Sequence, residues 1–179
     1  RSTNINCFNA NNGSAMAMAT GGTGPYQYSW IQTGASTVSV SNLAAGTYQA
    51  IVTDANGCTT SVSTTVSQPT VLNISTSSTA TTCGNNNGSV QASVTGGVFP
   101  YTYRWMPGNY LSYEYSNLGT GTYTVTITDG NGCTSSMNAM VNANPLPAAT
   151  ITSSNNVSCY GANNGSATVV ASSGAAPYY

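Results

Sequence analysis

Side chains that could carry out acid–base or nucleophilic chemistry are scarce in this chain of 179 residues. Its charged residues are Arg1, Asp54, Arg104, Glu114 and Asp129, and it contains no histidine. General acid–base catalysis needs titratable groups close together, and a serine needs a neighbouring base before it can act as a nucleophile. Because the two aspartates lie in separate segments and no lysine or histidine is present, the sequence predicts a protein that is not an enzyme.

The two aspartates occur in matching contexts, since Asp54 precedes Ala-Asn-Gly-Cys and Asp129 precedes Gly-Asn-Gly-Cys. Oxygen ligands suit calcium, which makes both carboxylates candidate calcium ligands. A calcium site takes about six to eight oxygens, however, and each loop offers one carboxylate. The other interpretation is an Asx-type turn that stabilises a hairpin between two strands. We favour the turn and expect no cofactor, and calcium is the alternative.

The overall charge restricts the partners that the chain could bind. Its net charge is −1 at pH 7, whereas a nucleic-acid-binding protein needs a basic stripe on its surface. No stretch approaches the roughly 20 consecutive apolar residues that a membrane-spanning helix requires. The sequence therefore predicts neither a nucleic-acid partner nor insertion into a membrane.

The chain repeats itself with a period of about 76 residues. We predict a first repeat over residues 1–68 with its N-terminal part missing, and a complete second repeat over 69–144. A third repeat over 145–179 would stop after its first two strands. Pro69 and the segment 144–147 are the predicted linkers, because proline interrupts strand pairing. The repeated motifs are NNGS at 11–14, 86–89 and 163–166, and PY at 25–26, 100–101 and 177–178.

Strand-like alternation of apolar and polar residues runs through each repeat, and no segment has a sustained helical period. Tyr123, Val125 and Ile127 share one face of their strand, and threonines occupy the other. We predict an all-β fold of tandem immunoglobulin-like β-sandwich repeats. The strands predicted in the second repeat are 71–83, 88–97, 101–106, 110–118, 122–129 and 133–141. Small apolar residues share a face of the second strand in every repeat, namely Ala15, Ala17 and Ala19, then Val90, Ala92 and Val94, then Ala167, Val169 and Ala171.

Six larger residues are predicted to form the structural core. One tryptophan per repeat would fill the centre of the sandwich. In immunoglobulin-like sandwiches a tyrosine at the start of the penultimate strand closes the preceding corner with its hydroxyl, and a leucine would plug that corner. These residues are Trp30 and Trp105, Tyr48 and Tyr123, and Leu43 and Leu118.

Met16 and Met18 alternate with the small apolar residues and are therefore predicted to face outward. Paired exposed methionines are typical of a contact surface, so this pair is a candidate contact patch for a neighbouring repeat or chain. The alternative is ordinary unevenness of one sheet face.

The order of motifs resembles a known family. The segments CFNANNGSAMAMATGGTGPYQYSW, at 7–30, and LAAGTYQAIVTDANGC, at 43–58, are similar to the SprB-type repeat of gliding bacteria of the Bacteroidetes group. That repeat reads C-x-G-x-x-D-G-S, then G-G-x-x-P-Y-x-Y-x-W, then L-x-x-G-x-Y-x-x-x-V-x-D-x-x-G-C. The chain departs from it at Asn12, Asn87 and Asn164, where the family usually has aspartate.

The resemblance implies a function as well as a fold. SprB-type repeats belong to adhesins on the bacterial cell surface that are exported by the type IX secretion system and form extracellular filaments. The resemblance thus implies the structural stalk of such a filament, used in gliding motility or attachment. Its partners would be neighbouring repeats of the same chain and like chains in the filament. Other regions of the protein would bind surface glycans or the substratum.

Five cysteines recur with the repeat, at Cys7, Cys58, Cys83, Cys133 and Cys159. No Cys-x-x-Cys pair and no histidine occurs, which argues against a zinc site. In a chain of the exported type that the resemblance implies, two cysteines per repeat indicate disulfides. We favour Cys7 with Cys58 and Cys83 with Cys133, with the partner of Cys159 beyond the chain end. The alternative joins Cys7 to Cys133 and connects successive repeats head to tail.

A second function is compatible with the same fold. In a glycan-binding β-sandwich module of a surface protein, aromatic side chains and loops hold the sugar. Tyr110, Tyr113 and Tyr115 are the candidates, because the first repeat has no aromatic residue at the corresponding positions.

Overall fold

The computed structural model describes residues 1–174 and residue 177, and within these residues every regular element is a β-strand. The described chain contains no helical segment with the length and apolarity needed to cross a bilayer. By its contacts the chain divides into two compact units. Unit 1 comprises Arg1–Ile74, Val94–Thr102 and Thr126–Ser136, and unit 2 comprises Ser75–Ser93, Tyr103–Val125 and Met137–Tyr179.

The first repeat, within unit 1, consists of two three-stranded sheets. Strands β1 (Ser2–Thr3), β2 (Gly13–Met16) and β4 (Ser39–Leu43) form one sheet in the order β1-β2-β4. Strands β3 (Gln27–Trp30), β5 (Gly46–Thr53) and β6 (Thr59–Val66) form the other in the order β3-β5-β6. All pairs are antiparallel, and β5 and β6 pair in unbroken register from Gly46↔Val66 to Thr53↔Thr59.

The core of this repeat lies between the two sheets. Buried side chains of β2 and β4 meet those of β3, β5 and β6, as in a β-sandwich. Trp30 is the largest of them and is 2% exposed. Its indole Nε1–H donates to the Thr37 carbonyl at 2.9 Å, which satisfies the one polar group of the ring. The buried cluster comprises Ile5, Ala15, Ala17, Trp30, Val40, Leu43, Ala50 and Val66.

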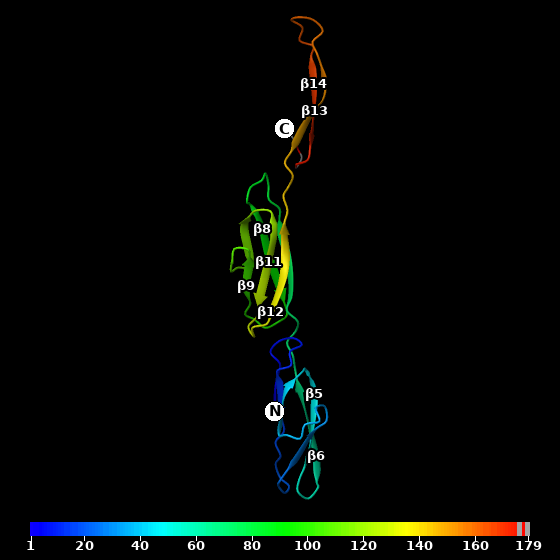
Figure 1. Cartoon of the computed structure of the whole chain (residues 1–179), viewed down its shortest axis with the longest axis vertical. Coiled ribbons are helices and arrows are strands. Elements are labelled where there is room, and N and C mark those ends of the chain that lie inside the picture. Colours follow the sequence, from blue (N-terminus) through cyan, green and yellow to red (C-terminus); the bar gives the residue numbers. More distant parts are fainter. Residues whose placement is uncertain (175–176, 178–179) are drawn as a thin grey trace. The chain divides into compact units, whose positions relative to one another are not determined.

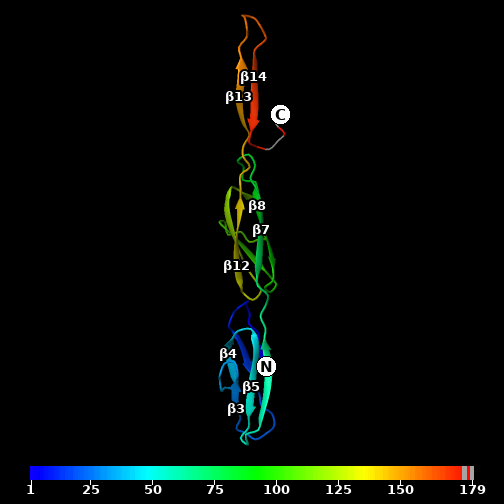
Figure 2. The same ribbon diagram turned by 90° about the vertical axis from the view of Figure 1, so that its right-hand side faces the viewer.

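The second repeat has the same strand order. One sheet runs β10-β8-β7, from strands β7 (Asn73–Thr79), β8 (Gly88–Thr95) and β10 (Glu114–Leu118). The other runs β12-β11-β9, from β9 (Thr102–Met106), β11 (Gly121–Thr128) and β12 (Thr134–Val141). Strand β11 lies between β9 and β12 (Figure 1), and in the perpendicular view β12 lies opposite β7 and β8 (Figure 2). The prediction of an all-β fold of repeated immunoglobulin-like sandwiches is confirmed.

One predicted strand is shorter than the sequence suggested. The expected strand over 110–118 begins only at Glu114. Pro107, Gly108 and Asn109 make a turn with positive φ at Gly108 and Asn109, and it returns Tyr110 to form an isolated bridge with Trp105. The Trp105 indole then donates to the Ser112 carbonyl at 3.0 Å. Residues 110–112 are thus bound to the tryptophan segment instead of to the sheet.

The last part of the chain is a single antiparallel hairpin of β13 (Ala148–Asn155) and β14 (Ser166–Ser172). Ala167, Val169 and Ala171 were expected to face a core like their counterparts in β2 and β8. Val169 is instead 60% exposed, because no second sheet covers this hairpin among the described residues. The third PY motif ends at Tyr178, which lies outside the described residues. The repeat boundaries at 68 and 144 stay predictions of the sequence.

Candidate functional site

The hairpin between β11 and β12 is organised by the carboxylate of Asp129. Its Oδ1 accepts hydrogen bonds from the backbone N–H groups of Asn131, at 2.9 Å, and Cys133, at 2.8 Å. Its Oδ2 accepts one from Val98 N–H at 3.0 Å. We call residues 129–133 the second Asp hairpin. The aspartate is 5% exposed and ties this hairpin to the loop before β9, as an Asx turn with one additional contact.

The first repeat contains the same arrangement at Asp54. Oδ1 accepts from Asn56 N–H and Cys58 N–H, both at 2.9 Å, and Oδ2 accepts from Thr23 N–H at 3.1 Å. Residues 54–58 are accordingly the first Asp hairpin. Matching geometry in two repeats shows that the Asp-x-Asn-Gly-Cys sequence specifies this turn locally.

Both carboxylates have a lowered pKa. Backbone hydrogen bonds from Thr23, Cys58 and Asn56 outweigh partial burial and lower the pKa of Asp54. For Asp129 burial acts most strongly and raises the pKa, but the hydrogen bonds from Cys133, Val98 and Asn131 together reverse that effect. Donors that point at a carboxylate favour its charged form, so both hairpins are stabilised by ionised aspartate.

The carboxylate oxygens bear directly on the calcium alternative. Each oxygen of Asp54 and Asp129 already accepts at least one backbone N–H, as the Asx turn requires. Among the described residues no three His, Cys, Asp or Glu side chains gather closely enough to hold a metal ion together.

The loop that carries the first cysteine of each repeat is held by the asparagine of its NNGS motif. Asn87 Oδ1 accepts from Thr82 N–H at 2.9 Å, and Asn87 Nδ2 donates to Thr82 Oγ1 at 2.6 Å. Asn164 holds Ser158 through the same two atoms, and Asn12 holds Asn6. In every case the asparagine is hydrogen-bonded to the residue just before the cysteine. We call these segments, residues 6–13, 82–88 and 158–165, the Cys loops.

Cys7 of the first Cys loop is bonded to Cys133 of the second Asp hairpin, with their Cα atoms 5.7 Å apart. Both residues belong to unit 1. Two further contacts accompany the bond: Asn131 Nδ2 donates to the Asn6 carbonyl at 2.8 Å, and the same carbonyl oxygen lies 3.3 Å from Cys133 Sγ. The bond therefore lies within a docked interface between the loop and the hairpin.

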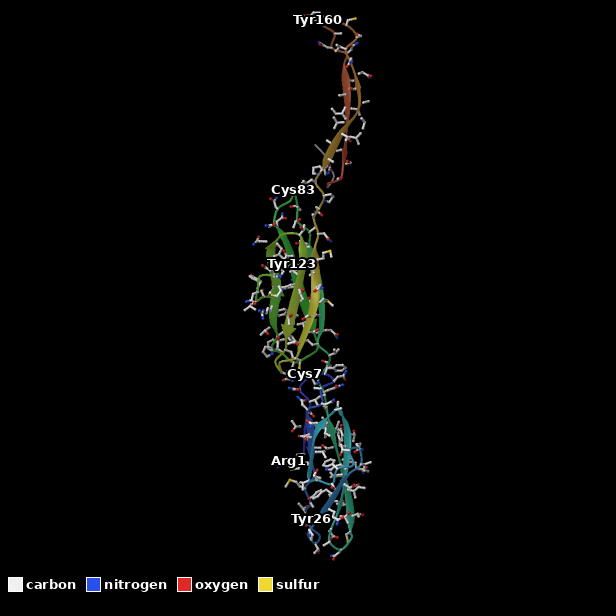
Figure 3. All side chains as sticks on the ribbon, viewed as in Figure 1. Arg1, Cys7, Tyr26, Cys83, Tyr123 and Tyr160 are labelled. Carbon is white, nitrogen blue, oxygen red and sulfur yellow. A yellow bond between two sulfur atoms is a disulfide. The ribbon has the colours of Figure 1, made fainter. Side chains whose placement is uncertain are left out.

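The favoured pairings of Cys7 with Cys58 and of Cys83 with Cys133 are wrong, and the alternative pairing is present. Ile5 N–H donates to the Ser67 carbonyl, which fixes Cys7 beyond the end of β6, whereas Cys58 precedes its start. Eight strand residues separate those ends by roughly 25 Å, far more than the roughly 7 Å that a disulfide tolerates between Cα atoms. In Figure 3 Cys7 and Tyr26, which lies near Cys58, accordingly appear at opposite ends of the repeat.

Three cysteines remain as free thiols. Cys58, Cys83 and Cys159 are all exposed. Cys58 belongs to an Asp hairpin, like Cys133, and the other two belong to Cys loops, like Cys7. The chain thus displays unbonded examples of both halves of the Cys7–Cys133 joint.

The segment between the first two repeats also occupies the end of the second repeat within unit 1. Gly97 N–H donates to the Thr70 carbonyl at 3.0 Å, and Leu72 packs over Gly97. A Cβ at Gly97 would lie 2.8 Å from Leu72 Cδ1, and one at Gly96 would overlap the Val71 carbonyl oxygen. Both glycines also have positive φ, so glycine is needed at both positions for the linker to lie here. We call the surface of Gly96 and Gly97 on which Thr70–Leu72 lie the seat of the linker. The recurrence of Gly-Gly at 21–22 was the sequence signal for it, and sequence reasoning assigned it no role.

The remaining predicted residues are placed as follows. Trp105, Leu43 and Leu118 are buried. Tyr48 and Tyr123 are half-buried, and their hydroxyls donate to the Ala44 carbonyl at 3.0 Å and the Gly119 carbonyl at 3.1 Å, the corner hydrogen bonds of an immunoglobulin-like sandwich. Met16 and Met18 are exposed and line a cleft of about 540 Å³ in the first repeat.

The tyrosines considered for glycan binding form a stack of their own. The rings of Tyr110 and Tyr115 are parallel within 11°, with centroids 4.6 Å apart, and Tyr115 meets Tyr123 edge-on at 5.9 Å. Tyr115 also covers Gly108. Tyr110 and Tyr113 remain about half exposed, so only part of this aromatic surface faces solvent.

Comparison with known proteins identifies one family. The model of the SprB repeat matches residues 1–35, 75–109 and 151–179, which together make up more than half of the chain. We found no match among curated protein sequences.

Two solved structures illustrate the structural similarity. The amphioxus IgVJ-C2 molecule is 14% identical at a TM-score of 0.36, and the alignment covers 77% of this chain and 99% of that one. The complex of Dpr2 Ig1-Ig2 with DIP-Theta Ig1-Ig3 is 14% identical at a TM-score of 0.30, with 71% and 59% covered.

Proposed function

Because this chain belongs to the SprB repeat family, we propose that it is a segment of the structural stalk of a secreted bacterial adhesin. The adhesin would be exported by the type IX secretion system, form an extracellular filament on the cell surface, and act in gliding motility or attachment. In this role the repeats act as spacers and carry out no catalysis. Their partners are neighbouring repeats and like chains, and other regions of the protein bind the surface glycan or substratum.

The covalent joint between Cys7 and Cys133 is the observation that carries this proposal. It connects the Cys loop of one repeat to the Asp hairpin of the next, with Asn131 and the linker around Thr70 seated beside it. Repeat proteins in which each unit contacts its neighbours can change length by changing copy number. The residues of this joint connect one repeat to the next, which is what a spacer needs and a binding site does not.

Copy number in the full-length gene provides the test. Inserting additional copies of residues 69–144 should lengthen the surface filament in proportion, measured by electron microscopy of labelled cells, while attachment of the cells is retained. Limited proteolysis of intact cells, followed by reduction of the disulfides, should release fragments of this segment. Filaments of unchanged length, or a segment protected from external protease, would contradict the stalk role.

A glycan-binding module is the second candidate, supported by the half-exposed rings of Tyr110 and Tyr113. Replacing both with alanine distinguishes the two functions, because a stalk needs no exposed aromatic surface there. The stalk predicts unchanged attachment and unchanged filament length. Loss of attachment with filaments of normal length, together with binding of the wild-type chain to a glycan array, would favour the module.

We further propose that Asp54 and Asp129 act as turn acceptors and that the chain uses no cofactor. The hydrogen bonds that both carboxylates already accept support this. Thermal unfolding of the chain should give the same midpoint in calcium and in a calcium chelator. A calcium-dependent rise in the midpoint that is lost in Asp129→Asn would instead favour a calcium site.

A further inference from the structure

The two Asp hairpins have equivalent neighbouring residues but differ in what covers them. Around each, a tyrosine hydroxyl donates to the carbonyl of the first glycine at 2.7 Å: Tyr26 to Gly21 and Tyr101 to Gly96. The φ angles of these glycines are 77° and 74°. The Asp54 and Asp129 carboxylates make equivalent hydrogen bonds. The two ends are therefore the same surface built twice.

At the second repeat that surface is occupied. The carbonyl of Val71 lies directly over Gly96, Leu72 covers Gly97, and Cys133 is bonded to Cys7. At the first repeat, a Cβ on Gly21 would meet nothing within 4 Å, and no hydrogen bond of the described chain uses the Gly22 N–H. Cys58 is a free, exposed thiol. The seat that Thr70–Leu72 fills in one repeat is open in the other.

The open seat forms part of the cleft of about 540 Å³. Gly21, Gly22, Asp54 and Cys58 line it, and Met16 and Met18 extend its apolar surface. Met18 is 69% exposed. An extended apolar segment lying in the cleft would cover its thioether. The corresponding residues of the second repeat are Gln91 and Ser93, so the open seat is the more apolar of the two.

We propose that this end of the first repeat is a docking site for the Cys-loop end of another SprB repeat that precedes it in the same polypeptide. The linker of that repeat would lie on Gly21 and Gly22, as Thr70–Leu72 lie on Gly96 and Gly97. Its loop cysteine would be bonded to Cys58. A linked repeat is the occupant because the filled seat takes both the loop and the linker that continues from it, and only a covalently continuous repeat brings both.

Asn56 supplies the remaining contact. Its Nδ2 donates to Thr23 Oγ1 at 3.1 Å, whereas Asn131 has Val98 at the corresponding position and donates to the Asn6 carbonyl of the docked loop. On docking, the Asn56 amide turns from the Thr23 hydroxyl to the carbonyl that precedes the incoming cysteine.

The chain also displays the complementary half of the joint. The Cys83 and Cys159 loops are held by Asn87 and Asn164 as the Cys7 loop is held by Asn12. Each loop presents an exposed thiol. By the same rule, each would bond to the Asp hairpin of the repeat that follows it.

Formation of the bond is an oxidation of two thiols. Cys58 and the incoming loop cysteine lose two protons and two electrons as their sulfur atoms join. A protein or low-molecular-mass disulfide outside the cell accepts the electrons and is reduced to two thiols, through an intermediate mixed disulfide. Exported proteins meet such oxidants, so the step is available to a chain of this type.

Disulfide mapping of the full-length protein tests the proposal. Protein isolated without reductant is alkylated to cap free thiols, digested with pepsin at low pH to prevent exchange, and examined by mass spectrometry. We expect the Cys58 peptide to be bridged to a Cys-loop peptide of another repeat, in a protein that is monomeric on a non-reducing gel. Cys58 recovered as an alkylated thiol, or bridged to a second copy of the protein, would overturn the proposal.

A serine variant provides a matched check. Cys58→Ser in the full-length protein should expose one additional alkylatable loop cysteine, from a repeat preceding Arg1, while Cys133→Ser should expose Cys7 instead. Circular dichroism confirms that both variants remain folded. An unchanged thiol count in Cys58→Ser contradicts the joint. This outcome is independent of the adhesive role, since the cell-attachment experiments read a different property.

Discussion

Asp129 shows how a single ionised side chain organises the end of a repeat. Its two oxygens satisfy three backbone N–H groups from two loops, and the same pattern recurs at Asp54. A buried donor without an acceptor costs about 1–3 kcal/mol. The hairpin therefore needs the aspartate as an acceptor for these N–H groups.

Acid should therefore destabilise the repeats through these two groups. Since the folded-state pKa of each lies below the ordinary aspartate value, ionisation stabilises the folded chain above about pH 4. That stabilisation is lost as the pH falls from about 4 through the lowered pKa. Urea unfolding between pH 7 and pH 2 should show this decline.

The variants Asp54→Asn and Asp129→Asn isolate the effect. The substituted side chain has a single acceptor oxygen, so its N–H₂ group would face either Val98 N–H or the donors of the hairpin. We therefore expect a loss of about 1–3 kcal/mol at pH 7 for Asp129→Asn. The double variant should have a flatter decline between pH 4 and pH 2 than the wild-type chain. An acid-side slope equal to that of the wild type would show that other groups control it.

At the scale of elements, Gly13 is a point where β2 lies tightly against the rest of the first repeat. A Cβ there would lie 2.6 Å from Val66 Cγ1 and 2.9 Å from the Leu43 carbonyl oxygen. The backbone oxygen cannot move aside, and Val66 is buried in the core. The strand can pair this tightly only with glycine at this position.

Gly13→Ala should consequently destabilise the first repeat by about 1–3 kcal/mol through overpacking. Gly46→Ala in β5 is the matched control, because a Cβ there would be 3.8 Å from Tyr48 and its backbone is not left-handed. We expect the control to change stability by less than about 1 kcal/mol. Denaturant unfolding of the two variants measures both values, and equal stabilities would contradict the role of Gly13.

The strands themselves could be predicted from the sequence, because alternation of residues such as Val125 and Ile127 with threonine is a local signal. The corner tyrosines and the turns of the Asp hairpins were equally local, since the tyrosine hydroxyl and the Oδ1 of each aspartate find their partners within four residues. The bonds from Thr23 and Val98 to Oδ2 are not local, because 31 residues separate each pair. The shortened strand at Glu114 was not predictable in this way, because it depends on how the Pro107 turn returns Tyr110 to Trp105.

The partner of Cys7 required information of another kind. Composition and spacing allowed two pairings, and the choice depends on which strand ends lie together. That is a property of the sheet order and of the seat that Gly96 and Gly97 provide for the linker. Gly-Gly recurs at 21–22 and 96–97, but its recurrence does not say which segment would lie on it.

At the scale of the whole molecule, the Cys7–Cys133 bond closes a loop with a sequence separation of 126 residues. When the chain is stretched from its two termini, tension passes across the sulfur atoms and bypasses that loop. Reduction should release about 430 Å of additional extension, at about 3.4 Å per residue. Single-molecule pulling with and without reductant measures the difference, and Cys83→Ser is the control because it leaves the bond intact. Equal extensions under both conditions would contradict a closed loop.

The same loop changes what a protease can accomplish. Hydrolysis of any one peptide bond between Cys7 and Cys133 leaves the two fragments joined through sulfur, so the chain remains one covalent object. Cys83 lies inside this loop, and a bond from it to a later hairpin would make successive loops overlap. Severing a stalk built in this way would take at least two events, one cut in the backbone and one at a disulfide. Its endurance outside the cell would then depend on redox conditions as much as on the stability of its folds.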